Sequence, residues 1–461
     1  MTICAISTAP GVGGIAVVRV SGKDAFTICD KLFKPFSEEI SITTMPANTV
    51  RFGQLINKSE LLDEVLVSVF RAPHSFTGEN VVEIACHGSQ FIQQELLKLL
   101  LANGCRLAHA GEFTQRAFLN GKMDLSQAEA VADVIASQSR AEHRLAMNQM
   151  RGGFSHELMV LRDQLLTFTS LVELELDFGD HEDLEFADRT QLHELAATIE
   201  TKIDNLVHSF GVGNAIKNGV PVAIIGETNA GKSTLLNVLL NEERAIVSDI
   251  HGTTRDVIED TINLHGVLFR FIDTAGLRQT SDVIETMGIE RTYKMIEKAT
   301  IVLWVIDALQ TDNRHEWLSE EVRRSAEGKQ LILVFNKVDK LDEAARQTLE
   351  KRFANYSAER IYISAKERIQ TDQLQELLYR SAQLPEVTDQ DIMVTNMRHY
   401  EALKNAHTAI IRVKVGLNDK ISGDFLSQDI RECLHYLGEI TGQITTDEVL
   451  GTIFSRFCIG K

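Results

Sequence analysis

The sequence predicts a multidomain α/β protein: an N-terminal α+β domain, then an all-α helical domain that is split by an inserted, doubly wound α/β domain. The chain has 461 residues, which is too long for one hydrophobic core. Short β-branched runs give way near residue 122 to apolar residues at helical spacing, and alternating strands and helices begin near 220. Helical spacing returns after 395, so an insertion between two parts of one helical domain is the simplest arrangement.

Residues 1–121 are expected to form the α+β domain. Strand-like runs lie at 15–20, 64–70 and 81–85, and one apolar helical pattern occupies 91–102. The N-terminus is apolar but lacks a basic segment. Its Gly-Gly break and its β-branched run "IAVVRV" favour a turn followed by a strand over a signal peptide.

Residues 122–216 and 383–461 are expected to form the two parts of the helical domain. Ser126 and Glu129 match a capping box ahead of an apolar run. Two apolar seams at helical spacing follow, one in each part: Leu158, Leu161, Leu165, Phe168 and Val172, then Leu426, Ile430, Cys433, Leu437 and Ile440.

Residues 217–382 are expected to form the inserted domain. Five apolar runs alternate with helical stretches, at 222–225, 268–272, 301–306, 331–335 and 361–363. Strands that alternate with helices predict a parallel sheet with helices on both faces.

The stretch "GETNAGKST" at 226–234 lies between the first of these strands and a helix. It matches the phosphate-binding loop G-x-x-x-x-G-K-[ST] in the strand–loop–helix context that the motif requires. Gly226 and Gly231 let backbone N–H groups surround phosphates, Lys232 reaches the β and γ oxygens, and Ser233 binds magnesium. The alternative, a glycine-rich turn without function, does not explain the lysine and serine.

Three further short motifs each follow a predicted strand. In "DTAG" (273–276), Asp273 suits the magnesium side and the Gly276 N–H suits the γ-phosphate. In "NKVD" (336–339), Asp339 can accept both N–H groups of a guanine edge, which adenine does not present. In "SAK" (364–366), Ser364 and the backbone can support the base. Together these motifs predict a guanine-nucleotide site with bound GTP.

These four motifs in this order resemble GTPases of the Ras-like superfamily, and "GTTRD" (252–256) resembles their first switch, with Thr254 as a magnesium ligand. Leu277 stands where such enzymes carry a water-positioning glutamine, and a leucine cannot orient water. Two residues are candidates for the missing catalytic role. The Asn229 amide can hold a monovalent cation against the phosphates, and Glu285 can position water; an ordinary loop amide and an exposed glutamate are the alternatives.

Composition limits the partners. The net charge is −18 and no block of Lys or Arg occurs, so a polyanion must meet a local basic patch or a second protein. The six cysteines form no C-x-x-C pair, which favours a reduced, cytoplasmic protein over a zinc protein. No apolar run is long enough for a membrane span, so no membrane partner is expected.

The chain ends in "FCIGK", which has two interpretations. A prenylation box at Cys458 is disfavoured, because the third position is not aliphatic, lysine is last, and only Arg456 gives basic support nearby. The second interpretation is that the tail contributes Cys458 and Lys461 to a site. Whether Cys458 acts as a nucleophile or as a structural thiol stays open.

Several longer stretches resemble the MnmE (TrmE) family of tRNA modification GTPases, over essentially the whole chain. They are "NAGKSTLLN", "IVSDIHGTTRDV", "IDTAGLR", "IETMGIER", "GEFTQRAFLNGKMDLSQAEAVADVI" and "FCIGK". Generic GTPases share the first three of these and not the last three.

The resemblance implies a function that spacing alone does not show. Members form homodimers through a folate-binding N-terminal domain and join the flavoprotein MnmG in a heterotetramer. They add a carboxymethylaminomethyl or aminomethyl group to C5 of the wobble uridine of certain tRNAs, with 5-formyl- or 5,10-methylene-tetrahydrofolate as the one-carbon donor. GTP hydrolysis in the family depends on potassium and on pairing of the two GTPase domains.

Carried over to this sequence, the resemblance implies Asn229 and the carbonyls of Ser248, Ile250 and Thr253 as potassium ligands, and Ser233 and Thr254 as magnesium ligands. It implies Glu285 as the water-positioning residue. The nucleotide- and cation-binding positions are Asn229, Ala230, Gly231, Lys232, Ser233, Thr234, Ser248, Asp249, Ile250, His251, Gly252, Thr253, Thr254, Asp273, Thr274, Ala275, Gly276, Asn336, Lys337, Asp339, Ser364, Ala365 and Lys366.

For folate, the resemblance implies Arg19, Glu83, Lys122 and Lys461. A carboxylate can pair with the amino-pyrimidine edge of a pterin, and cations suit the glutamate tail. The C-terminal tail is then expected to fold back near the folate, with Cys458 and Lys461 beside the one-carbon unit.

Two other functions remain as alternatives at this stage. A ribosome-assembly or metal-delivery GTPase would usually carry a KH-type RNA-binding loop or metal-binding His and Cys runs, and neither is evident. A one-carbon transferase in which GTP is only regulatory would leave tRNA unmodified.

Overall fold

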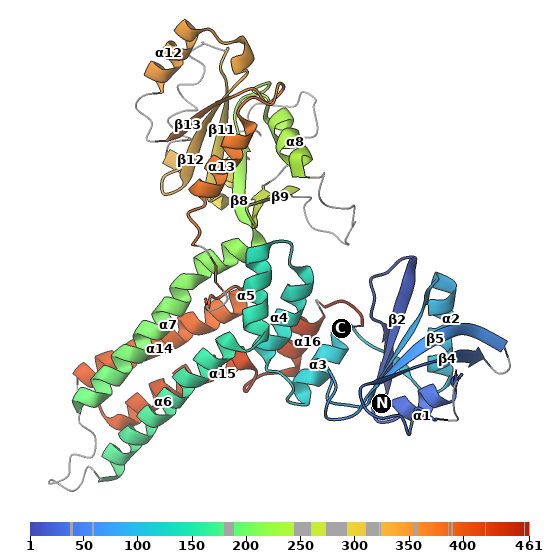
Figure 1. Cartoon of the computed structure of the whole chain (residues 1–461). Helices are drawn as coiled ribbons and strands as arrows, with labels where there is room; N and C mark the ends of the chain where they lie inside the picture. Colours follow the sequence, from blue (N-terminus) through green and yellow to red (C-terminus); the bar gives the residue numbers. More distant parts are fainter. Residues whose placement is uncertain are drawn as a thin grey trace. The chain divides into compact units, whose positions relative to one another are not determined.

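The structure is a computed structural model of the chain, drawn in Figure 1. It describes residues 1–36, 40–57, 60–178, 189–243, 260–272, 293–309, 322, 324–353, 358–385, 387–388, 391–419, 421–455 and 457–460.

Two compact units make up the chain. One comprises residues 1–135, 149–203 and 402–461, and the other comprises 136–148 and 204–401. The expected domain boundaries at 121/122, 216/217 and 382/383 lie where the spacing of apolar residues changes, and they do not coincide with this division. They stay a prediction.

The N-terminal part is built on a mostly antiparallel sheet in the order β3-β4-β5-β6-β2-β1-β7. Its strands are β1 (Ile3–Ile6), β2 (Gly13–Ser21), β3 (Phe33–Pro35), β4 (Thr49–Asn57), β5 (Glu60–Phe70), β6 (Val81–Gly88) and β7 (Arg106–Leu107). The three strands expected from the sequence are confirmed as β2, β5 and β6, and the expected helix is α2 (Gln90–Ala102).

The two faces of this sheet differ in chemistry, because strand side chains alternate between faces. On one face Val18, Val20 and Ile84 pack with α1 (Ala25–Asp30) and α2 in the main core. The other face carries a small apolar cluster that includes Ala5 and Phe113. Arg19 and Glu83 belong to this second face, since they alternate with the core residues.

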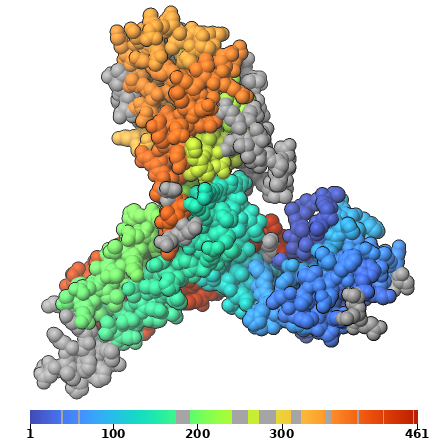
Figure 2. Space-filling model, in the orientation of Figure 1, coloured from blue at the N-terminus to red at the C-terminus, as the bar shows by residue number. Residues whose placement is uncertain are grey.

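The helical part comprises α3 (Glu112–Leu119), α4 (Leu125–Ala136), α5 (Arg140–Met150), α6 (Gly153–Phe178), α7 (Arg189–Asn218), α14 (Met397–Asn418), α15 (Gly423–Thr441) and α16 (Asp447–Phe454). The helices α6 and α15 pack against each other although they are far apart in sequence (Figure 1). Figure 2 shows one face of the molecule, on which α6 and α7 lie at the surface. Both apolar seams predicted for these helices are buried, which confirms them.

The predicted capping box at Ser126 and Glu129 is wrong. Helix α4 already begins at Leu125, so Ser126 lies inside the helix. Asp124 caps it instead: its carboxylate accepts a hydrogen bond from the Gln127 N–H (2.8 Å), and the Gln127 side chain accepts one from the Asp124 N–H (3.0 Å). This is the same reciprocal arrangement, two residues earlier in the chain and with aspartate in place of serine.

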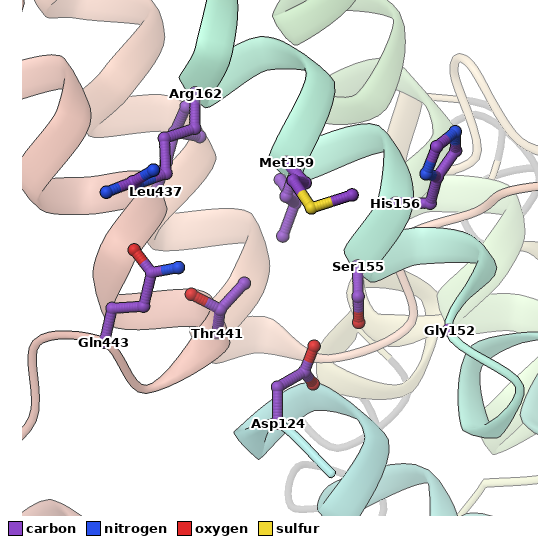
Figure 3. A pocket seen from close by; sticks show the side chains of 10 residues that line it. Asp124, Gly152, Ser155, His156, Met159, Arg162, Leu437, Thr441 and Gln443 are labelled. Atoms are coloured by element: carbon purple, nitrogen blue, oxygen red, sulfur yellow. The ribbon is translucent and has the colours of Figure 1, made fainter. Parts of the chain in front are cut away.

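A pocket of about 280 Å³ lies between the first turns of α6, the end of α15 and Asp124 (Figure 3). The side chains of Met159 and Leu437 contribute apolar surface to it. Part of its polar lining already serves the local fold, because Asp124 caps α4 and the Ser155 hydroxyl lies 3.0 Å from the Ser126 hydroxyl. None of the residues predicted to bind nucleotide or folate lines this pocket.

The inserted domain is built on a sheet in the order β13-β12-β11-β8-β10-β9. Its elements are β8 (Val220–Ile225), α8 (Lys232–Glu243), β9 (Asp260–Leu264), β10 (Val267–Phe271), β11 (Ile301–Asp307), β12 (Gln330–Asn336), a 3₁₀ turn η2 (Val338–Lys340), α12 (Glu343–Arg352), β13 (Glu359–Ile363) and α13 (Thr371–Ser381). The five predicted strands are confirmed and are parallel, and β9 adds an antiparallel edge that the sequence analysis missed.

Helices cover both faces of this sheet (Figure 1). Val222 and Ile224 of β8 pack on one face with α8 and α13, while Ala223 and Ile225 pack on the other face, in the cluster that includes Phe353 just after α12. This alternation of two buried faces is the doubly wound arrangement that the sequence predicts. Among the described helices of the chain, none is long and apolar enough to cross a membrane.

Candidate functional site

The phosphate-binding loop lies at the carboxyl end of β8, with α8 beginning at Lys232. Strand β8 lies between β10 and β11, where the order of the strands reverses. In doubly wound sheets this switch point is where ligands bind, because the loops on either side diverge. The fold therefore places the loop where a nucleotide can reach it.

The backbone of the loop requires its glycines. Gly226 has φ +142°, and a Cβ there would lie 2.1 Å from the Val305 carbonyl oxygen. Gly231 has φ +96°, and a Cβ there would lie 2.2 Å from the Asn336 side-chain nitrogen. Both approaches are shorter than any Cβ contact can be, so a larger residue at either position would displace the loop.

The Lys232 ammonium turns back onto the loop that precedes it. It donates hydrogen bonds to the carbonyl oxygens of Gly226 (2.7 Å) and Glu227 (2.6 Å). Burial lowers the pKa of Lys232 from its usual value. An anionic phosphate beside this ammonium would stabilise its charged form, which is the chemistry expected of a lysine that binds the β and γ oxygens.

Asn229 is exposed at the tip of the loop and has φ +63°, a left-handed conformation that asparagine tolerates better than most residues. Ser233 is half-buried at the start of α8, and Thr234 beside it is exposed. Of the expected cation ligands, only Asn229 and Ser233 fall within the described residues. An amide oxygen and a hydroxyl are both suitable ligands for hard cations.

Asn336 connects the phosphate-binding loop with the "SAK" loop. Its side-chain NH₂ donates to the Ala230 carbonyl oxygen (2.8 Å), and its side-chain oxygen accepts from the Ala365 N–H (3.0 Å). This buried amide therefore fixes the distance between the two loops that are expected to hold the two ends of a nucleotide.

The side chains of Asp339, which is exposed, and Ser364, which is buried, contact each other. The Ser364 hydroxyl donates to the Asp339 carboxylate at 2.6 Å, and this hydrogen bond lowers the pKa of Asp339. A carboxylate that stays ionised is the acceptor that two guanine N–H groups need. Lys366 is exposed and lies 3.6 Å from Glu367.

Many predicted site residues lie outside the described residues. They are Ser248, Asp249, Ile250, His251, Gly252, Thr253, Thr254, Asp273, Thr274, Ala275, Gly276, Glu285 and Lys461. Leu277, which replaces the water-positioning glutamine, and Arg456 also lie outside the described residues.

Arg19 and Glu83 are neighbours across β2 and β6 and form an ion pair at 2.8 Å. The Arg19 guanidinium also lies over the rings of Phe76 and Phe113, at 5.5 and 5.6 Å from their centroids. Lys122 is held separately, by a hydrogen bond of 3.0 Å from its ammonium to the Pro73 carbonyl oxygen. Two of the expected folate residues are thus brought together, as partners of each other.

The C-terminal tail packs on the N-terminal sheet. Ile459 forms an antiparallel bridge with Ala110, and the Ser7 hydroxyl donates to the Gly460 carbonyl oxygen (3.1 Å). Gly460 has φ +96°, and a Cβ there would lie 2.2 Å from the Ile6 carbonyl oxygen. Ala5, next to Ile6, is the strand partner of Arg19, so Gly460 lies near the strand position of Arg19. Cys458 is exposed.

Sequence reasoning missed a polar network beside this pair. Glu112 is buried and accepts hydrogen bonds from Arg106, Arg116 and the His109 N–H. Burial alone would raise its pKa, but these hydrogen bonds outweigh that effect and lower the pKa of Glu112 to about 2. Arg116 continues the network to Glu79. The sequence signal was the spacing of Glu112 and Arg116, four residues apart in "GEFTQR", which does not reveal burial.

Together, the phosphate-binding loop at the switch point, the Asn336 bridge and the Asp339–Ser364 pair define a P-loop protein of the GTPase class, set within a helical domain.

Comparisons with known proteins identify the family. The model for the MnmE helical domain matches residues 125–458, and the model for the GTP-binding protein TrmE N-terminus matches residues 2–122. The chain belongs to the MnmE family and is a GTPase of that family.

Relatives match over the full length. Proteins named tRNA modification GTPase MnmE are 60% identical in Bacteroides thetaiotaomicron, 59% in Parabacteroides distasonis and 50% in Flavobacterium johnsoniae. Each match covers 100% of this chain and 99%, 100% and 99% of the relative, respectively. A solved structure of Era with MgGDPNP and a 16S ribosomal RNA fragment is 28% identical over 41% of this chain and 66% of its own, with a TM-score of 0.28, and adds nothing to the assignment.

Proposed function

We propose that the chain is a potassium-activated GTPase that works with MnmG to add a carboxymethylaminomethyl or aminomethyl group to C5 of the wobble uridine of certain tRNAs. The observation that carries the proposal is the phosphate-binding loop. Its Lys232 can bind a triphosphate, and its exposed Asn229 can bind a cation. Full-length relatives named for tRNA modification support the substrate class. The expected domain boundaries at 121, 216 and 382 are part of this proposal.

In this proposal Asn229 provides a side-chain ligand to potassium, and Ser248, Ile250 and Thr253 complete the ion's coordination through their carbonyls. Ser233 and Thr254 bind magnesium, and Glu285 positions the attacking water. A potassium ion at Asn229 would place positive charge beside the transferring phosphoryl group, where other GTPases use an arginine. The exposed, left-handed Asn229 supports this assignment because its amide is not committed to the core.

We propose that Arg19, Glu83, Lys122 and Lys461 bind 5-formyl- or 5,10-methylene-tetrahydrofolate. Support comes from the Arg19–Glu83 pair, which concentrates a carboxylate and a guanidinium on one sheet face beside two aromatic rings. The N–H groups of a pterin edge could donate hydrogen bonds to the Glu83 carboxylate, while the two Phe rings hold the Arg19 guanidinium in place. Cys458 would lie nearby through the bridge between Ile459 and Ala110.

We further propose a homodimer formed through the N-terminal domain. Phe36, Val50, Phe52 and Leu66 are 51%, 50%, 50% and 46% exposed. They share one face, because Phe52 is the strand partner of Leu66 and its ring lies 4.9 Å from that of Phe36. A patch of this kind is typical of an interaction surface. Phe52→Asp should give monomers by light scattering, and dimers of unchanged affinity would contradict the assignment.

The acidic net charge and the free cysteines bear on the remaining partners, MnmG and tRNA, and on the compartment. At a net charge of −18, the chain is expected to rely on MnmG, in a heterotetramer, for much of the positive surface that tRNA needs. All six cysteines are free, which fits the reducing cytoplasm.

Two measurements test the proposal. In a strain that lacks the gene, wobble-uridine modification should be absent and should return with the wild-type chain and not with Lys232→Ala. Unchanged tRNA in the deletion strain would remove the proposed function. The second measurement is GTP hydrolysis by the purified chain, which should require potassium.

A further inference from the structure

The end of strand β11 carries a buried carboxylate that no part of the proposed function uses. Asp307 is the last residue of β11 and is 6% exposed. Both of its carboxylate oxygens have partners: Oδ2 lies 2.6 Å from the Lys337 ammonium, and Oδ1 accepts a hydrogen bond from the Leu309 N–H at 3.0 Å. A buried carboxylate is costly unless it is paired, so this ion pair is an integral part of the local structure.

The partner, Lys337, has an unfavourable backbone conformation. Its φ is +72°, in the left-handed region that residues other than glycine mostly avoid. It directly precedes the 3₁₀ turn Val338–Lys340, and the Lys340 N–H donates to its carbonyl oxygen (3.2 Å). The conformation of Lys337 therefore sets the direction in which this turn leaves the sheet.

That turn carries Asp339, the proposed acceptor for guanine. The ends of β11 and β12 are held together, because Asp307 and Asn336 are strand partners and the Ala308 N–H donates to the Asn336 carbonyl oxygen at 3.0 Å. Beyond the ends of these strands, the Asp307–Lys337 ion pair connects β11 with the residue that directly precedes the turn. On the other side of the turn, Ser364 holds Asp339.

We propose that Asp307 is a positioning residue for guanine recognition, acting through Lys337. Its carboxylate anchors the Lys337 ammonium, keeps the backbone of Lys337 left-handed and so aims the Asp339 carboxylate at the base. The inference rests on the proposed role of Asp339. It adds a residue from a different strand, outside the four nucleotide motifs, to the determinants of base specificity.

The substitution Asp307→Asn tests this role, because asparagine has the same size and keeps an oxygen that can accept from Leu309. Affinities of the full-length protein for GDP and IDP are measured by fluorescence competition. IDP lacks the 2-amino group, so it can offer Asp339 only one of the two N–H groups of guanine. We expect GDP affinity to fall by about tenfold and the preference for GDP over IDP to shrink, since a misaimed Asp339 loses the second hydrogen bond.

Lys337→Met tests the same pair from its more exposed side and covers the case in which Asp307→Asn does not fold. The double variant should be no worse than the more affected single variant, because both changes remove one interaction. Lys329→Met is the matched control. Lys329 binds the Glu297 and Ala299 carbonyl oxygens, near the opposite end of β12, and its loss should leave the GDP to IDP ratio unchanged.

The outcomes separate the inference from the function on which it rests. If the wild-type chain does not prefer GDP to IDP, the base site itself is misassigned. If it does, a GDP to IDP ratio that is unchanged in both Asp307→Asn and Lys337→Met overturns the positioning role. Equal losses for GDP and IDP, with additive effects in the double variant, would show that Asp307 only supports the fold.

Discussion

The Ser364 hydroxyl donates a 2.6 Å hydrogen bond to the Asp339 carboxylate, so a residue from the "SAK" loop orients a residue from the "NKVD" loop. The two residues follow different strands, β13 and β12, which are adjacent and parallel. Their contact explains how two short motifs can form one side of a base site.

The first prediction concerns this pair. Asp339→Asn should shift preference from guanine to xanthine nucleotides, because the amide NH₂ can donate to the additional carbonyl oxygen of xanthine. Ser364→Ala should keep guanine preference with an affinity loss of up to about tenfold, since it removes only the supporting hydrogen bond. Competition binding with GDP and XDP measures both changes. If Asp339→Asn still prefers GDP, the base site lies elsewhere.

The second prediction concerns the monovalent cation. Replacing potassium with sodium, or Asn229 with Ala, should slow GTP hydrolysis by about 10³-fold while nucleotide affinity survives, if the cation replaces an arginine finger. Steady-state hydrolysis and fluorescent-nucleotide binding, measured on the same samples, separate the two effects. Asn237→Ala, at an exposed residue of α8 outside the predicted nucleotide-binding positions, is the control. Equal rates in both salts would defeat the assignment of Asn229.

A third prediction concerns Glu285, which lies outside the described residues. Glu285→Ala should bind GTP as tightly as the wild type and lose turnover, because a water-positioning residue acts on the attacking water rather than on the bound nucleotide. Single-turnover hydrolysis of bound GTP, followed by rapid quench, measures the chemical step directly. A normal single-turnover rate in this variant would assign water positioning to another residue.

The sequence predicted the parts of the fold that rest on local pattern. Strands β8, β11 and β12 are buried on both faces and appear as unbroken apolar runs, so they could be placed without a structure. Strand β9 could not be placed that way, because its residues alternate and it lies at an edge. A sequence signal was present in His265–Gly266, because a two-residue turn that ends in glycine is typical of a tight hairpin. In the structure both residues have positive φ, +51° and +83°, between β9 and β10.

Contacts between distant strands were beyond sequence reasoning. Arg19 and Glu83 were each predicted as folate residues, but their direct ion pair depends on the register of β2 and β6, which local pattern does not fix. The same holds for the Lys337–Asp307 pair at the ends of β12 and β11. Asp124 was missed for a different reason: two overlapping capping patterns occur, and the helix begins at the earlier one.

The last prediction concerns pH and the buried Glu112. Its pKa is lowered to about 2, so its ionised form contributes stability above the ordinary glutamate pKa of about 4.5, and that contribution is lost as the pH falls from about 4.5 toward 2. Glu112→Gln should therefore destabilise the protein by about 1–3 kcal/mol at pH 7 and by progressively less in acid, because the neutral amide cannot form charged pairs with Arg106 and Arg116. Calorimetric unfolding of both proteins between pH 7 and pH 3 measures the difference.

Glu95→Gln is the control for this prediction. It removes a surface pair with Lys98 and should change stability little at any pH. A difference between wild type and Glu112→Gln that stays constant over this range would mean that the Glu112 carboxylate is not held in its charged form by the two arginines.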